Sequence, residues 1–348
     1  MTKKKIKNTI RIYGTETSIH LLNDPDITQY FIDETYRCVP HSIKSVNVLI
    51  LLIGYNKKLQ IFELCLIATM NKENLDMYKQ FYLQLKTMYN FKPKIITCDF
   101  NLSNINAINE IFSENEVVII PCFFHLVQCW WRNANKYGLR KKKIVEHTRV
   151  MIFNLKLIPF LKETEAIEFY HKIKDEFDQE EFIPFFDYFE RNWLNLSEEN
   201  DSKYKLDIWS YYGKFYFKET RKALISKDVL DKYIFISNNA CESVNNLINN
   251  FIQINSKVSV DKFEMIIKTL FIRLECNRNN RNQNKERIIH KRVLSDILLE
   301  IINSGFGQNL KIIRLDQYKK LKNKQNENTI FKILNFDENK EDNDNDEC

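Results

Sequence analysis

Short apolar runs rich in β-branched and aromatic residues dominate the first third of the chain, which is the pattern of strands. Three of them follow closely, TQYFIDETYRCV from Thr28, SVNVLILLIGY from Ser45 and LQIFELCLIATM from Leu59, and residues 54–58 are expected to form a hairpin turn. Two shorter buried runs, KIITCDF and VVIIPC, come later. The pattern predicts five strands in this part of the chain.

Helical spacing of apolar residues separates the later strands. It predicts helices over 74–90, 102–113 and 123–138, the last ended by Gly138. The resulting order, β-β-β-α-β-α-β-α, predicts an α/β fold with a mixed sheet and helices on both faces. This is the order of a ribonuclease H-like core.

The pattern changes beyond that core. From Arg140 to residue 233 it is helical and aromatic, which predicts an all-α insertion, followed by a helix that begins near residue 239 and by further helices. We expect Trp193, Trp209, Tyr211 and Tyr212 to belong to the core of the insertion, with base stacking as the alternative for some of them. The expected division is a basic arm (1–26), the first part of the core (27–139), the insertion (140–233), the final catalytic helix with C-terminal helices (234–305) and an extension with a disordered acidic tail (306–348).

Charge is distributed unevenly along the 348 residues. The net charge is +6, but the last twelve residues hold seven acids against one lysine, so the remainder carries +12. A basic body of this kind fits a polyanionic partner. No apolar run is long enough to cross a membrane, no signal peptide is evident, and the eight cysteines have no framework spacing. We therefore expect a soluble protein in a reducing intracellular compartment.

Three acids are the candidate chemical groups: Asp33 and Asp99, near the ends of predicted neighbouring parallel strands, and Glu242, at the start of a helix. A buried carboxylate is costly unless it meets a cation or a strong donor. Three that converge would form a site for hard divalent ions, as in two-metal phosphodiester chemistry.

Each acid also has a structural explanation. Asp33 would be a strand-end acid that faces water. Asp99 would cap the next helix, with Asn101 and Ser103 as rival caps. Glu242 would complete a capping box with Asn239.

The helix that follows Glu242 has two distinct faces. Its apolar stripe consists of Val244, Leu247, Ile248 and Phe251, and the opposite face of Glu242, Asn245, Asn246 and Asn249. A helix with one face in the core and the other lined by a carboxylate and amides suits a site that holds metal and nucleic acid.

The spacing of two further groups of residues indicates candidate chemistry. Cys122 and His125, with Cys129 a turn further, have the spacing of half a zinc site, but without a second ligand pair a structural zinc is not expected. His125 is alternatively a phosphate contact. Candidate DNA contacts are Asn246 and Asn249 on the helix after Glu242. Further candidates are Arg278, Arg281, Lys285 and Arg292, which lie on one predicted helical face and have a solvated face as the alternative.

Taken in order, YFIDETYRCVP, KIITCDF, CFFHLVQCWWR, FFDYFERNW, IWSYY and SNNACES resemble the transposase domain of Mutator-like elements, the MULE family. The resemblance runs from about residue 28 to 255. It implies a ribonuclease H-like core with a helical insertion before the last acid, and a DDE triad of Asp33, Asp99 and Glu242 that binds two Mg²⁺ or Mn²⁺ ions. Cys122 and His125 would be the accessory motif, double-stranded DNA the substrate, and the nucleus the location.

The chain departs from the family pattern at two places. The family usually has an acid two residues after the second Asp, where this chain has Asn101, and neither an N-terminal nor a C-terminal zinc module is visible. The leading hypothesis is a DDE transposase, with a homodimer left open. The alternatives are a catalytically inactive, transposase-derived DNA-binding protein and a nuclease that acts on RNA–DNA hybrids.

Overall fold

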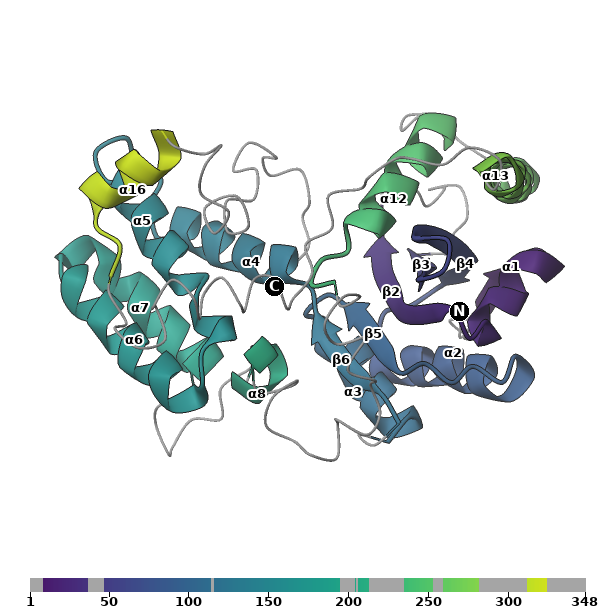
Figure 1. Ribbon diagram of the computed structural model, residues 1–348, viewed down its shortest axis with the longest axis horizontal. Helices are drawn as coiled ribbons and strands as arrows, with labels where there is room; N and C mark the ends of the chain where they lie inside the picture. Colours follow the sequence, from purple (N-terminus) through teal and green to yellow (C-terminus); the bar gives the residue numbers. More distant parts are fainter. Residues whose placement is uncertain are drawn as a thin grey trace, which may run out of the picture. The chain divides into compact units, whose positions relative to one another are not determined.

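The computed structural model describes residues 9–36, 47–113, 116–194, 204, 206–212, 235–252, 259–281 and 312–323 (Figure 1). The chain divides into two compact units, one of residues 1–122 with 237–291 and the other of residues 123–236 with 292–348. The second unit is thus inserted into the first, and the last part of the chain returns to it. Within the described ranges, no helix is both long and apolar enough to span a bilayer.

The first unit is built on a six-stranded sheet in the order β1-β4-β3-β2-β5-β6. Strands β2, β3 and β4 are antiparallel neighbours, and β5 and β6 run parallel to β2. The predicted mixed sheet is therefore confirmed. The strands are β1 (Ile10–Tyr13), β2 (Ile27–Thr35), β3 (Val48–Asn56), β4 (Ile61–Met70), β5 (Ile95–Cys98) and β6 (Val118–Pro121).

The pairing of β2 with β5 positions the candidate site. Tyr30 pairs with Ile96 and Phe31 with Thr97, in parallel register. Because both strands run in the same direction, the segments that follow these pairs reach the same edge of the sheet. The expected adjacency of the strands that carry Asp33 and Asp99 is thus observed.

Helices cover the sheet of the first unit. Helices α2 and α3 pack against each other on one side, and α12 contacts β2 and β3 on the other (Figure 1). Asn74 caps α2, with its side chain accepting from the Met77 N–H, and Asn101 caps α3. The helices are α1 (Glu16–His20), η1 (Leu21–Asn23), α2 (Leu75–Met88), α3 (Leu102–Ile111), α12 (Asn239–Ile252) and α13 (Val260–Arg281).

A correction concerns the N-terminus, which the sequence assigned to an arm over residues 1–26. From Ile10 the chain forms strand β1, which pairs antiparallel with β4 at the edge of the sheet, with Ile10 opposite Met70. Helix α1 follows, begun by a capping box between Thr15 and Ser18. Elements of four and five residues are too short for their periodicity to be recognised, and β1 depends on its partner strand for hydrogen bonds.

The described elements of the second unit are helices and helical turns. The unit already includes α4, which the sequence had assigned to the core. Its elements are α4 (Phe123–Lys136), α5 (Val145–Leu155), η2 (Ile158–Phe160), α6 (Glu163–Glu176), η3 (Glu180–Phe182), α7 (Ile183–Phe189), the π-helical turn η4 (Glu190–Leu194), α8 (Leu206–Trp209) and α16 (Leu315–Asn323).

Three tryptophans form the centre of the second unit. Trp130, Trp193 and Trp209 are fully buried, and their rings meet edge to face with centroids 5.9–6.1 Å apart. Tyr211 is also fully buried. The core role expected for Trp193, Trp209 and Tyr211 is confirmed, and their burial excludes base stacking by them, whereas Tyr212 is only half-buried.

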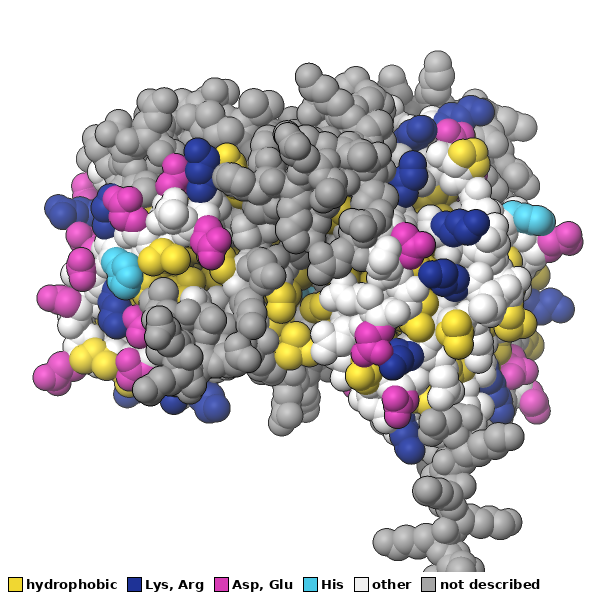
Figure 2. Space-filling model, turned by 90° about the horizontal axis from the view of Figure 1, so that it is seen from below, with side chains coloured by type: hydrophobic (Ala, Val, Ile, Leu, Met, Phe, Trp, Pro, Cys, Tyr) yellow, Lys and Arg dark blue, Asp and Glu magenta, His cyan; other side chains and the backbone are white. Residues whose placement is uncertain are grey.

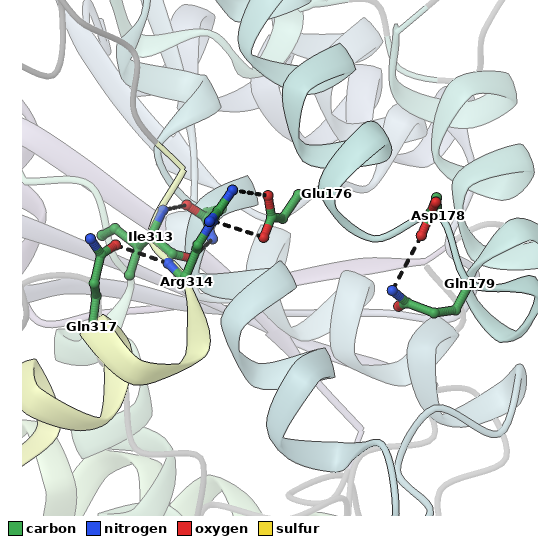
Figure 3. Close-up of polar contacts among 7 residues, drawn as sticks. Glu176, Asp178, Gln179, Ile313, Arg314 and Gln317 are labelled. Atoms are coloured by element: carbon green, nitrogen blue, oxygen red, sulfur yellow. Dashed lines mark hydrogen bonds and ion pairs between the residues drawn. The ribbon is translucent and has the colours of Figure 1, made fainter.

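The segment around α16 is attached to this unit by polar contacts, and the sequence had not predicted it. The buried amide of Asn154 donates to the carbonyl of Ile313 and accepts from its N–H, both at 2.9 Å. Arg314 points its guanidinium at the carboxylate of Glu176, with nitrogen–oxygen distances of 3.1 and 3.2 Å (Figure 3). A cleft of about 460 Å³ lies beside these residues, lined by His147, Glu176, Phe177, Gln179, Arg314, Leu315, Asp316 and Lys319.

Candidate functional site

Asp33 lies near the end of β2 and is 5% exposed. Its Oδ2 accepts a hydrogen bond of 2.7 Å from the side-chain amide of Asn245 on α12, and its Oδ1 lies 3.5 Å from the amide nitrogen of Asn238. Asn238 also donates to the carbonyl of Ile32 at 3.1 Å. Two amides therefore orient the Asp33 carboxylate, which compensates for part of its desolvation.

Asp99 follows β5, and the cap of the next helix is Asn101, whose side chain accepts from the N–H groups of Ser103 at 3.0 Å and Asn104 at 3.4 Å. The alternative role of Asp99 as a helix cap is thus filled by Asn101. The Oδ1 atom of Asp99 is buried, and no N–H or hydroxyl of the described residues donates to it.

The carboxylates of Asp33 and Asp99 each offer a ligand oxygen within 4.8 Å of the other. Two carboxylates at this separation repel unless they share a proton or a cation. Oxygen donors are the ligands that Mg²⁺ and Mn²⁺ prefer. The undonated, buried Oδ1 of Asp99 also fits a cation partner, so the donor set of the first unit suits a divalent ion.

Glu34 follows Asp33 on β2 and is a further buried carboxyl group, which sequence reasoning missed. It is 8% exposed and accepts a 2.8 Å hydrogen bond from the amide of Asn104 on α3. Burial raises the pKa of Glu34 well above its usual range, and the nearby Asp99, Glu73 and Asp33 raise it further. The available signal was the adjacent acid in the Asp33-Glu34 pair, but alternation along a strand places neighbours on opposite faces.

Glu242 lies in the first turn of α12 and is half-buried. The helix begins at Asn239, so Asn238 precedes it, and the Glu242 N–H donates to the Asn238 carbonyl at 3.3 Å. Within the described parts of the chain, Glu242 does not join the ligand oxygens of Asp33 and Asp99 that lie within 4.8 Å. It lies three residues before Asn245, which places both on one side of the helix. The expected triad stays a prediction.

The faces of α12 differ in one respect from the expected division. Cys241 and Ile248 are fully buried, and Asn245 lies on the same side because its amide reaches Asp33. The sequence had placed Asn245 on the face opposite the apolar stripe. The core-facing side of α12 was inferred from its apolar residues alone. Asn245 is polar because it meets the buried carboxylate of Asp33, so that inference missed it.

Cys122 has a structural role in the first unit. Its thiol is fully buried, its sulfur accepts from the N–H of Asn238 at 3.3 Å, and its own N–H donates to the Cys98 carbonyl at 2.7 Å. It therefore connects the entry to α12 with the end of β5. His125 lies three residues later, in the first turn of α4.

The predicted DNA contacts are only partly described. On α12, Asn246 is exposed and Asn249 is half-buried. Arg278 and Arg281 belong to α13, whose last residues have no described side chains, and Lys285 and Arg292 lie outside the described residues.

Surface charge in the described residues is mixed. Figure 2 shows lysine and arginine side chains interspersed with aspartates and glutamates on the face that it draws. Ion pairs among the described residues include Lys79 with Glu110, 2.5 Å apart, and Lys86 with Glu116, 3.6 Å apart. Exposed pairs of this kind contribute little to stability.

The sequence matches a protein-family model. Residues 29–129 match the model of the MULE transposase domain family. The matched MULE transposase domain runs from β2 into α4 and contains Asp33, Asp99, Cys122 and His125, whereas Glu242 lies beyond its end. The match indicates a transposase-related function and DNA as the class of partner. No curated protein matches the chain.

Proposed function

We propose that this protein is a DDE-type DNA transposase that uses divalent ions to cleave and transfer DNA strands. The observation that carries the proposal is the meeting of Asp33 and Asp99 at one edge of the sheet, inside the matched domain. The strand order β4-β3-β2-β5-β6, with β3 antiparallel to its neighbours, supports a ribonuclease H-like core.

Asp33 and Asp99 would hold the ions, with Glu242 as the third ligand. In support, α12 is anchored to Asp33 through Asn245, one turn after Glu242. The thiol of the neighbouring Cys241 has its pKa raised first by burial and then by the charges of Asp33, Asp99, Cys122 and Glu242. When bound, two Mg²⁺ ions would activate the attacking hydroxyl group and stabilise the leaving oxygen.

The protein's own residues would fix the geometry. Asn245 and Asn238 hold the Asp33 carboxylate through its two oxygens, and the Asn101 cap leaves Asp99 available as a ligand. Basic residues of the C-terminal helices would hold the DNA backbone, in the nucleus.

The test is divalent-dependent nicking of a duplex that carries an element end. Wild-type protein should nick in Mg²⁺ or Mn²⁺, and Asp99→Asn should lose the activity, because the variant keeps the side-chain shape but removes the charge. Asp76→Asn, an exposed acid in the first turn of α2, is the matched control and should nick like wild type. Equal activity of Asp99→Asn and wild type would reject the assigned site.

A second function is a non-catalytic, transposase-derived DNA-binding protein. The observation that favours it is the place of Glu242 outside the close group of ligand oxygens in the described residues. Salt-sensitive DNA binding without nicking in any divalent ion would select it.

A further inference from the structure

The turn that joins α4 to α5 (Figure 1) carries a concentration of positive charge. Between Glu116 and Glu146 the sequence has no acidic residue, and its cationic residues are Arg132, Lys136, Arg140, Lys141, Lys142 and Lys143. We call residues 136–143 the basic turn. It belongs entirely to the second unit.

The lysines of the basic turn lack acidic partners. All of them are exposed, and none forms an ion pair within the described parts of the chain. Glu146, the first acid after the turn, pairs with Arg149 instead. Elsewhere in the second unit lysines do meet acids, as Lys172 meets Glu168 at 2.7 Å. Neighbouring like charges repel one another, and an anionic partner would remove that repulsion.

Hydrogen bonds fix the backbone of the basic turn. The Leu139 N–H donates to the Ala134 carbonyl at 2.9 Å, and Gly138 before it has a φ of +78°. These are the features of a Schellman cap, in which glycine takes the left-handed conformation. The Lys141 carbonyl then accepts from the N–H of Val145 at 3.0 Å, where α5 begins. The turn therefore has a defined conformation between the two helices.

Packed side chains anchor the basic turn to the helices around it. Leu139 is fully buried, and its carbonyl accepts a 2.7 Å hydrogen bond from the hydroxyl of the buried Thr148 on α5. The ring centroid of Tyr137 lies 6.1 Å from that of Tyr188 on α7. Because the backbone is already ordered, a partner of the lysines would not have to order it on binding, which lowers the entropic cost of the complex.

We propose that the basic turn binds the phosphate backbone of duplex DNA and positions the DNA without reading its sequence. Lysine ammonium groups meet phosphates as point charges, and such contacts contribute affinity through the release of counterions. The inference rests on the proposed function in its choice of DNA as the polyanion, and it needs no metal ion. It places a DNA contact in the helical second unit, in addition to those on the C-terminal helices.

Fluorescence anisotropy of a labelled duplex with the full chain, at several salt concentrations, tests this contact. In Lys141→Gln/Lys142→Gln/Lys143→Gln the Kd should rise about tenfold or more at about 0.1 M salt. The slope of log Kd against log salt concentration should fall by about one for each lysine that meets a phosphate. Both changes should be equal for an element-end duplex and an unrelated duplex. Lys141→Arg/Lys142→Arg/Lys143→Arg keeps the charge and should bind like wild type.

A second control removes the same charge at another place. Lys58, Lys92 and Lys94 are exposed lysines of the first unit, at the edge of the sheet where β2 and β5 begin. Lys58→Gln/Lys92→Gln/Lys94→Gln should change the Kd by less than about twofold. An equal loss in this variant would show that net charge, and not the basic turn, determines the affinity, and it would reject the inference.

The outcomes distinguish the contact from the activity. If the glutamine variant of the basic turn binds DNA as tightly as wild type, the inference is rejected and the proposed function stands. Tighter binding also rejects it and would indicate that the turn holds the acidic tail of residues 337–348. If only the affinity for RNA of the same length falls, the turn is an RNA contact and the inference is rejected. If DNA binding weakens as expected while wild type nicks DNA in no divalent ion, the inference stands and the transposase activity is rejected.

Discussion

The side-chain amide of Asn245 donates a 2.7 Å hydrogen bond to Oδ2 of Asp33, although the two residues are 212 positions apart in the sequence. This contact joins α12, which the chain forms after the helical insertion, to the central strand of the sheet. It carries the first turn of α12, with Glu242, to the side of the sheet on which Asp33 lies. The insertion is thus accommodated without separating α12 from the site.

Removing this amide should destabilise the first unit. Asn245→Ala should lower the free energy of unfolding by about 1.5–3 kcal/mol, because a buried carboxylate loses a hydrogen bond to its charged group. Urea denaturation measures the change. Asn246→Ala, the exposed neighbour on the same helix, should change it by about 0.5 kcal/mol or less. Equal losses in the two variants would show that the contact does not stabilise the fold.

The tryptophan cluster should dominate the stability of the second unit. Trp209→Ala should lower the free energy of unfolding by about 3–5 kcal/mol, since it leaves a cavity and removes the donor to the Trp193 carbonyl. Ile183→Ala is the control, because Ile183 is 50% exposed in the same unit. Urea unfolding monitored by circular dichroism measures both variants. Similar losses of unfolding free energy in Trp209→Ala and Ile183→Ala would contradict the prediction.

Much of the sheet could be predicted from the sequence because its strands are local, continuous apolar runs. The same holds for α2 and α3, whose starts carry cap residues that are recognisable in the sequence. Strand β1 could not be predicted, since four residues become a strand only through pairing with β4. Helix α16 was missed for a similar reason, because contacts with Asn154 and Glu176, far away in the sequence, hold its segment.

The candidate site was predictable in part. Asp33 and Asp99 close apolar runs, and the parallel pairing that brings them together followed from the order of the elements. Glu34 and Asn104 could not be recognised, because their significance lies in a contact between β2 and α3 that no periodicity reveals. Asn245 was assigned to the wrong side of its helix, since its polar side chain meets a buried carboxylate instead of solvent.

The attachment of α16 allows two kinds of contact to be compared. Asn154→Leu should destabilise the second unit by about 1–3 kcal/mol, because it leaves the N–H and carbonyl of Ile313 without their buried partner. Arg314→Ala should cost about 1 kcal/mol or less, because the Arg314 side chain is 67% exposed where it meets Glu176. Limited proteolysis near α16, with urea denaturation, measures both. If Arg314→Ala destabilised the protein more than Asn154→Leu, the ion pair and not the buried amide would be the main attachment of α16.

Alkaline pH should destabilise the second unit through Tyr204. Burial raises the pKa of Tyr204 from its ordinary value of about 10 to about 12. Because the folded state keeps this proton longer than the unfolded state, the contribution is complete below about pH 10 and is lost as pH rises through about 12. Tyr204→Phe lacks this group, so its stability should decrease less than that of wild type between pH 9 and 11, as followed by urea midpoints. If the stability of wild type and of Tyr204→Phe fell equally with pH, Tyr204 would not be the group responsible.

The position of a bound divalent ion tests the central claim most directly. Crystals of the full chain grown with Mn²⁺, and measured for its anomalous scattering, should show a peak about 2.1 Å from a carboxylate oxygen of Asp33 and of Asp99. The Asp99→Asn variant should lose that peak. An anomalous peak that touches neither carboxylate, or the same peak in Asp99→Asn, would contradict the account.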